Sequence, residues 1–240
     1  SIIESNYIND LYEYIKFKLK NFKETNFNIN REALNIFSTL ANKGILPKKL
    51  LTALIMAYNE KIADIKLKDN IIELINLHIK NYGCEEIIQE LIRKLLKKNN
   101  PKILIEYGNL FGKILTDNQQ GNNMPFKDLI DFAKCMANNS NPKVRSASTD
   151  LICILYKTYG ASVRAAIKDI KDSTLKIIDA ELDKIQLSPE QQENINNNMQ
   201  NIKVPSKNDE KENKKQEIVA GPVNPQDISK KITKEILKDI

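Results

Sequence analysis

Few side chains in this sequence have the types and spacing that chemistry requires, and the nitrogen and sulfur ligands show this most clearly. There is one histidine, His78, and the three cysteines, Cys84, Cys135 and Cys153, lie far apart. A structural zinc site needs four such ligands at short, regular spacings. We therefore predict no metal site, a structural role for His78, and buried, reduced thiols of the kind found in intracellular proteins.

The sequence patterns of enzymes are also absent. No glycine is followed by the Lys-Ser or Lys-Thr pair of a phosphate-binding loop. Two carboxylate pairs, Glu85–Glu86 and Asp179–Glu181, lie on amphipathic segments with no sign of a pocket, and solvated helix faces account for them. We predict a protein that is not an enzyme and that holds no cofactor.

The net charge indicates what kind of partner the protein would bind. The formal net charge is +6, which favours an acidic partner, although no Arg-rich block concentrates it. Nucleic-acid binding by helical repeats needs stacking aromatics or a repeated side-chain code, and neither is present. No apolar run approaches the ~20 residues that span a bilayer, and residues 1–20 lack the apolar stretch of a signal peptide. We expect a soluble, intracellular protein with neither a nucleic-acid nor a membrane partner.

The spacing of the glycines indicates the secondary-structure elements that would position a functional site. Gly44, Gly83, Gly121 and Gly160 are spaced by 39, 38 and 39 residues, and three of them end similar strings with a nearby Lys. Glycine after a helix, with Lys in the last turn, is a helix stop. A constant period of this size is typical of a helical solenoid.

A second break falls about halfway through each period. These breaks are residues 23–26, 66–69, 99–102 and 141–145, and the last two contain Asn-Asn-Pro-Lys and Asn-Pro-Lys-Val-Arg. Proline after asparagine favours a turn followed by a helix, because it presets the first helical turn and has no amide to leave unpaired. Each period therefore predicts a helix, a tight turn, a second helix and a glycine.

Apolar stripes support the helices at 142–159 and 172–186. Leu175, Ile178, Leu182 and Ile185, for example, step by three, four and three residues. One pair alone cannot bury such stripes, so we predict an all-α stack of helix pairs over residues 1–186. Residues 187–225 are mostly polar and predict a disordered linker. The apolar pattern that resumes over 226–240 predicts the first helix of a following domain.

Several of these strings together resemble one family. Residues 141–147 (Asn-Pro-Lys-Val-Arg-Ser-Ala), 160–164 (Gly-Ala-Ser-Val-Arg) and 178–184 (Ile-Asp-Ala-Glu-Leu-Asp-Lys) resemble the end of a TOG domain in the ch-TOG family of microtubule polymerases. Residues 23–27 and 41–44 resemble the second HEAT repeat of that family's third TOG domain. Residues 227–233 are similar to the opening of the next TOG domain. The resemblance begins within the second repeat, which implies that residues 1–186 lack the first one; either that repeat lies upstream of residue 1 or it has diverged.

The resemblance implies an α-solenoid of HEAT-like helix pairs whose short turns form one edge that grips the αβ-tubulin dimer. For Arg145 two roles are open, a tubulin contact or a tie to an Asp on a neighbouring turn. The turns at matching positions give the expected tubulin-binding residues, which are Lys23, Thr25, Asn26, Lys66, Lys68, Lys98, Asn100, Lys102, Asn141, Lys143 and Arg145, with Glu24 beside them.

The function implied is that of a tubulin-binding module in a microtubule-associated protein that regulates microtubule growth and spindle organisation. Other TOG domains in the same longer chain would be its neighbours. Its location would be the cytoplasm, on microtubules and at spindle poles or the microtubule-organising centre. The alternative is a general α-solenoid scaffold or adaptor that does not bind tubulin directly and uses its concave surface instead.

Overall fold

The computed structural model describes residues 2–117, 124–187, 192 and 195, all within Ser1–Ile202, the first of two units into which the chain divides. The regular elements of these residues are all helical. They are α1 (Ile2–Lys18), α2 (Phe27–Asn42), α3 (Lys48–Tyr58), the 3-10 helix η1 (Asn59–Ala63), α4 (Lys68–Tyr82), α5 (Glu85–Leu95), α6 (Pro101–Asp117), α7 (Phe126–Ala137), α8 (Pro142–Tyr159), α9 (Ala161–Ala166) and α10 (Asp172–Leu182).

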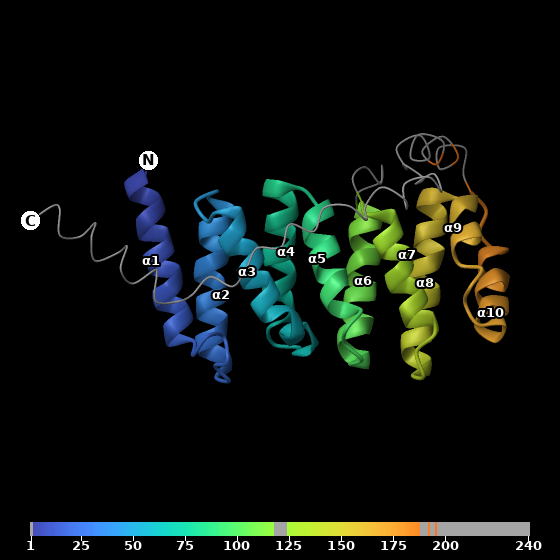
Figure 1. The fold of residues 1–240 in the computed structure, drawn as a ribbon, viewed down its shortest axis with the longest axis horizontal. Coiled ribbons are helices and arrows are strands. Elements are labelled where there is room, and N and C mark those ends of the chain that lie inside the picture. Colours follow the sequence, from blue (N-terminus) through green and yellow to red (C-terminus); the bar gives the residue numbers. More distant parts are fainter. Residues whose placement is uncertain (1, 118–123, 188–191, 193–194, 196–240) are drawn as a thin grey trace, which may run out of the picture. The chain divides into compact units, whose positions relative to one another are not determined.

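Consecutive helices form antiparallel pairs that stand side by side in a row (Figure 1). The second helices of the pairs pack against one another in order, α2 on α4 and α6 on α8, and α10 follows on α8. Apolar stripes on both helices of a pair thus meet those of the next pair, which is how a solenoid builds a continuous core. The predicted α-solenoid of helix pairs is confirmed.

The glycines end the pairs as the spacing predicted. Gly44 has φ +68°, and Gly83 and Gly160 have φ +85° and +62°. The ψ values of Gly83 (167°) and Gly160 (−140°) place them outside the left-handed helical region, in or near an extended region that is almost exclusive to glycine. Gly121 lies outside the described residues. The glycines recur because the backbone at these chain reversals adopts positive φ, a conformation in which any other residue would be strained.

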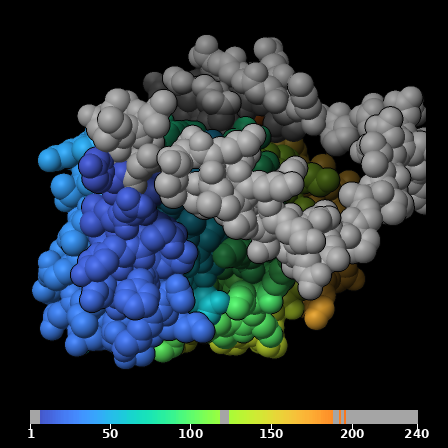
Figure 2. Space-filling view, turned by 60° about the vertical axis from the view of Figure 1, so that its left-hand side comes forward, coloured from blue at the N-terminus to red at the C-terminus, as the bar shows by residue number. Residues whose placement is uncertain are grey.

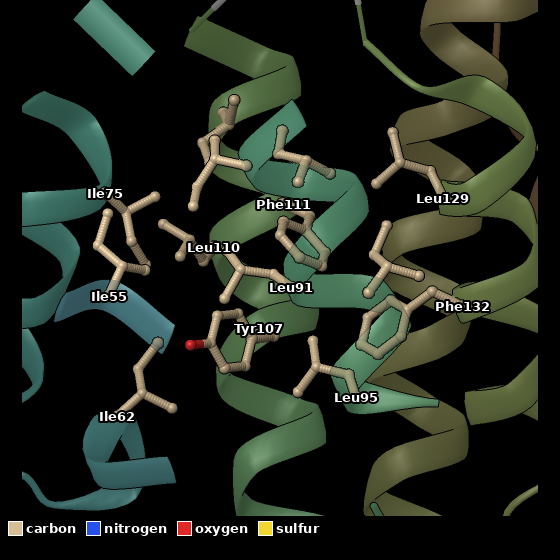
Figure 3. Close-up of a cluster of buried hydrophobic side chains, with 14 of the residues drawn as sticks. Ile55, Ile62, Ile75, Leu91, Leu95, Tyr107, Leu110, Phe111, Leu129 and Phe132 are labelled. Atoms are coloured by element: carbon tan, nitrogen blue, oxygen red, sulfur yellow. The ribbon is translucent and has the colours of Figure 1, made fainter. Parts of the chain in front are cut away.

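The core runs through all the pairs, and large side chains fill its middle. Figure 3 shows Tyr107 of α6 between Ile62 and Leu95, with its hydroxyl directed toward η1. That hydroxyl donates to the carbonyl oxygen of Asn59 at 3.2 Å, so the only polar atom of the side chain is satisfied. Phe111 of α6 meets Phe132 of α7 edge-on, with ring centroids 5.4 Å apart. Burial of such side chains stabilises the stack by about 1.5–3 kcal/mol each.

Two predicted boundaries differ in the structure. The break expected at 66–69 lies earlier and is longer, because η1 extends α3 and α4 already begins at Lys68. The helix expected over 172–186 ends at Leu182. Ile195 is buried, and its side chain would lie 2.9 Å from a Cβ at Gly160. Most of the predicted linker and the whole of 226–240 lie outside the described residues, so the domain boundaries remain predictions.

His78 and Cys84 lie inside the helix stack, as expected for structural side chains. His78 is buried, its Nε2 is 2.9 Å from the Thr52 hydroxyl oxygen, and burial lowers its pKa. Cys84 is buried, whereas Cys135 and Cys153 are only half-buried. Within the described ranges, no three His, Cys, Asp or Glu side chains cluster in a way that would hold a metal ion. The helices of those ranges also include none with the length and apolarity to cross a membrane.

Candidate functional site

The turns inside the pairs lie along one edge of the stack, the lower edge in Figure 1. We call this the turn edge, and it comprises residues 19–26, 59–67, 96–100, 138–141 and 167–171 together with the first turn of the helix that follows each. Each turn is linked to the preceding turn by a hydrogen bond or a salt bridge. The four contacts are Lys61 Nζ to Glu24 O (2.8 Å), Lys98 Nζ to Glu60 Oε1 (2.6 Å), Asn139 Nδ2 to Asn99 Oδ1 (3.0 Å) and Lys171 N to Asn138 Oδ1 (3.4 Å).

The first turn has an unusual backbone. Lys20, Asn21 and Phe22 all have positive φ values, between 52° and 64°. Residues other than glycine adopt positive φ only at a steric cost. Contacts with the surrounding residues must therefore hold the backbone of this turn in place. Phe22 does so by packing its ring against Tyr12 and Tyr58, with centroids 6.1 and 5.6 Å away. The turn is thus fixed to the core of the first two pairs.

A buried polar network completes the first turn. The Glu24 carboxylate accepts from the amides of Thr25 and Asn26, both at 2.8 Å, and pairs with Lys20 at 2.9 Å. The Lys20 ammonium and the Asn26 amide hold the pKa of Glu24 at about 2. Glu24 therefore stabilises the turn from inside and does not present its charge to a partner.

Asn30 connects this network to the second pair. Its Nδ2 donates to the carbonyl oxygens of Glu24 and Asn26 at 3.0 and 2.8 Å, and its Oδ1 accepts from the Tyr58 hydroxyl at 2.7 Å and Lys61 Nζ at 3.2 Å. Burial lowers the pKa of Lys61. Asn30 fills all its hydrogen-bonding positions and so fixes the first turn relative to the second.

Three of the predicted binding residues are helix caps. The Oδ1 atoms of Asn26, Asn100 and Asn141 accept from the amides two residues later, at 2.9, 3.1 and 2.9 Å. An asparagine cap typically contributes about 1 kcal/mol to stability. Their presence in the turns is therefore explained by folding, whatever else they contact.

Three of the predicted basic residues have partners within the chain. Lys68 pairs with Glu106 at 2.5 Å, and Lys98 pairs with Glu60. Arg145 donates from Nη1 to the carbonyl oxygens of Asn139 and Ser140 at 3.0 and 2.8 Å. The arginine thus braces its own turn, and this contact differs from the predicted tie to an Asp on a neighbouring turn.

The remaining predicted residues are exposed at the turn edge: Lys23, Thr25, Lys66, Lys102 and Lys143. Lys66 lies with its Nζ 5.4 Å from the centroid of the Phe27 ring. In the part of the chain that the structure describes, no acidic side chain pairs with Lys23, Lys102 or Lys143. The edge therefore presents positive charge from three different turns to an approaching partner.

Comparison with known proteins identifies the architecture. Residues 32–182 match the family model described as XMAP215/Dis1/CLASP, TOG domain. That range covers more than half of the chain and all the helices from within α2 to α10. The chain belongs to this TOG-domain family.

Three relatives resemble this TOG domain over 68% of its chain. Protein MOR1 of Oryza sativa subsp. japonica is 25% identical over 165 residues, and Protein MOR1 of Arabidopsis thaliana is 26% identical over 165. Centrosomal protein 224 of Dictyostelium discoideum is 23% identical over 176 residues. The chain spans only 8% of the length of these relatives.

A solved structure shows the same fold. The third TOG domain of Drosophila melanogaster Mini spindles matches with a TM-score of 0.66 and 20% identity, over 76% of this chain and 81% of that one. The resemblance to a third TOG domain, inferred from residues 23–27 and 41–44, agrees with this match.

The turn edge of this TOG domain also carries two apolar residues that sequence reasoning missed. Ile65 is 86% exposed and lies beside Lys66, and Leu96 is exposed in the next turn. A β-branched apolar residue between Asp64 and Lys66, outside any helical stripe, was the available signal. Together with Lys23, Lys102 and Lys143, these side chains make the edge both basic and apolar.

Proposed function

We propose that this TOG domain binds the αβ-tubulin dimer through its turn edge and acts as one module of a microtubule-associated protein that regulates microtubule growth and spindle organisation. The observation that carries the proposal is that exposed lysines of the first, third and fourth turns, without an acidic partner among the described residues, lie on one edge, within a family to which the resemblance assigns tubulin binding. Lys23, Lys102 and Lys143 supply the attraction to an acidic tubulin surface.

The wider context of the proposal follows from the relatives. One of them is named a centrosomal protein and the matched structure is from Mini spindles. We place this domain on the microtubule cytoskeleton, at spindle poles or the microtubule-organising centre, in a longer chain with further TOG domains. The domain is a binding module and not an enzyme.

The free lysines act mainly on encounter with tubulin. An individual exposed charge pair is worth ~0.2–1 kcal/mol, so no single lysine dominates. Their summed field accelerates association and weakens as salt is added. Ile65 and Leu96 add apolar contact once the edge has docked. The exposed caps Asn26 and Asn100 are available for hydrogen bonds with tubulin through their remaining amide groups.

The test is a matched pair of charge reversals. The variant Lys102→Glu/Lys143→Glu reverses two charges at the turn edge, and the control Lys113→Glu/Lys127→Glu reverses two exposed charges on α6 and α7 away from it. Thermophoresis with unpolymerised tubulin should show affinity reduced about tenfold or more by the first variant and little by the control. Equal losses of affinity in the two variants, or an affinity that neither variant changes, would contradict binding through the turn edge.

A further inference from the structure

A small cavity lies at the turn edge, between the first turn and the second. Its volume is about 250 Å³. In Figure 2, where α1 comes forward, the turn edge is the lower edge of the molecule. Pockets that enclose whole small-molecule ligands measure roughly 300–1,000 Å³, so this cavity suits a single side chain of a protein partner. We call it the first-turn cavity, and it is lined by Lys23, Glu24, Thr25, Phe27, Asn30, Lys61, Asp64 and Leu67.

The Lys61 ammonium lies in the first-turn cavity without a carboxylate partner. Its Nζ donates to the carbonyl oxygen of Glu24 at 2.8 Å and to Oδ1 of Asn30 at 3.2 Å. Both oxygens belong to uncharged groups, and Lys61 makes no ion pair with any residue that the structure describes. Two oxygens leave one of the three ammonium donors for a further acceptor. Lys61 is therefore a half-buried cation whose charge nothing nearby neutralises directly.

The two carboxylates of the lining are engaged elsewhere. Glu24 accepts from two backbone amides and pairs with Lys20 at 2.9 Å, so its charge is already balanced. Asp64 Oδ1 accepts from the backbone amide of Lys66 at 2.9 Å and holds the second turn. With Glu24 offset by Lys20, the cations Lys23 and Lys61 outnumber the single carboxylate of Asp64. Burial also lowers the pKa of Lys61, as expected for an ammonium whose lost hydration is not fully replaced.

The first-turn cavity is formed before any partner arrives. Asn30 is only 1% exposed, and all its hydrogen-bonding positions are filled within the chain. Leu67 is buried, and the Phe27 ring packs under the cations of Arg31 and Lys66 at 5.2 and 5.4 Å. A side chain that enters therefore displaces water without having to order the walls.

We propose that the first-turn cavity binds one acidic side chain of the protein partner, with the entering carboxylate paired to Lys61 Nζ. This inference rests on the proposed function, since the partner is the acidic surface of tubulin. The lining selects a carboxylate, which can accept from Lys61, from Lys23 and from the Thr25 hydroxyl. A basic side chain would meet the Lys61 ammonium, and an apolar one would cover that ammonium without pairing it.

The first-turn cavity and the exposed lysines then have different parts in binding. Exposed charges at a rim act mainly on the association rate, whereas a charge pair that becomes buried on docking acts mainly on the dissociation rate. Lys61 thus sets the lifetime of the complex with tubulin. Lys102 and Lys143 set how fast that complex forms.

Three variants that each change the charge by one unit separate these parts. Lys61→Met removes the ammonium in the cavity. Thr25→Glu supplies a carboxylate from the chain itself at the cavity and keeps the Lys61 side chain with its bonds to Glu24 and Asn30. The control Lys102→Met removes an exposed charge of the third turn, outside the cavity. Association and dissociation rates with unpolymerised tubulin are measured by interferometry on residues 1–240.

We expect both cavity variants to accelerate dissociation about tenfold or more and to leave the association rate within about twofold. The control should slow association by up to about twofold and leave dissociation unchanged. Because Lys61 also links the first two turns, the thermal midpoint of each variant is measured alongside. If Lys61→Met does not fold, Thr25→Glu decides alone.

The cavity proposal is overturned if neither cavity variant accelerates dissociation more than the control does. It is also overturned if Lys61→Met folds and only one of the two variants accelerates dissociation. Loss of the link between the turns, or a general change of surface charge, would then account for the effect. These outcomes leave the turn edge intact as the binding surface, which fails separately if Lys102→Glu/Lys143→Glu does not weaken tubulin binding.

Discussion

Lys61 and Glu24 join two repeats directly, because the Nζ of Lys61 lies 2.8 Å from the carbonyl oxygen of Glu24. Lys61 is in η1, the element that lengthens the second turn, and Glu24 is in the first turn. Similar contacts run on through the third and fourth turns. The turn edge is therefore a preformed surface, and a partner that binds it has little ordering entropy to offset.

Asn30 should be the most sensitive polar residue of the first turn. Asn30→Ala removes two donors to carbonyl oxygens and leaves the buried Tyr58 hydroxyl without its acceptor. We expect the free energy of unfolding to fall by about 2–3 kcal/mol, measured by urea denaturation. Asn109→Ala, at an exposed position of α6, should change it by less than about 0.5 kcal/mol. Equal effects of the two variants would show that the network does not hold the turn.

Substitution of Arg145 should lower the stability of the domain, whereas substitution of Lys143 should weaken only its binding to tubulin. Arg145→Ala removes the donor to two carbonyl oxygens of its own turn and should cost about 1–2 kcal/mol of stability. Lys143→Ala removes an exposed side chain and should leave stability unchanged while weakening tubulin association. Thermal denaturation and tubulin affinity are measured on both variants. The account would be wrong about Arg145 if its loss left stability intact and reduced only affinity.

Gly160 should tolerate a side chain less well than Gly44. Alanine at Gly160 combines a positive φ with a Cβ 2.9 Å from the Ile195 side chain, whereas nothing lies within 4 Å of a Cβ at Gly44. We expect losses of about 2–3 kcal/mol at Gly160 and about 1 kcal/mol at Gly44. Replacing Ile195 by alanine in the Gly160→Ala background should recover part of the loss. No recovery in that double variant would exclude the steric contribution.

Glu24 should make the domain sensitive to acid. Its pKa is lowered from 4.5 to about 2 in the folded state. A carboxylate with a depressed folded pKa contributes stability that is fully present above pH 4.5 and is lost as the pH falls toward 2. Glu24→Gln should therefore show a shallower decline of stability between pH 4.5 and 2 than the unsubstituted chain. The control Glu73→Gln, on the surface of α4, should keep the original slope, and an unchanged slope in Glu24→Gln would argue against the network.

The helix ends at Gly83 and Gly160 and the helix start at Asn141 could be predicted because their causes are local. Gly83 and Gly160 need backbone conformations that other residues avoid, and Asn141-Pro142 supplies both a cap and a preset first turn. The network of Asn30 and Lys61 could not be predicted in this way. Its partners are 31 residues apart in the chain, and only the stacking of the pairs brings them together.

The roles within the turn edge could be predicted only in part. The sequence places Lys98, Lys102 and Lys143 in turns, but it cannot show that Glu60 of the neighbouring turn pairs with Lys98 and leaves the other two unpaired. Likewise, the exposure of Ile65 depends on how η1 ends. Pairing between repeats, and not turn position alone, decides which charges reach a partner.

The most direct test of the central claim is hydrogen–deuterium exchange of the chain with and without unpolymerised tubulin. Binding through the turn edge predicts slower exchange of amides in residues 19–26, 59–67, 96–100 and 138–141. The chain reversals at the opposite edge, residues 43–47 and 83–84, should not change. Protection of those reversals in place of the turns, or no protection at saturating tubulin, would contradict the account.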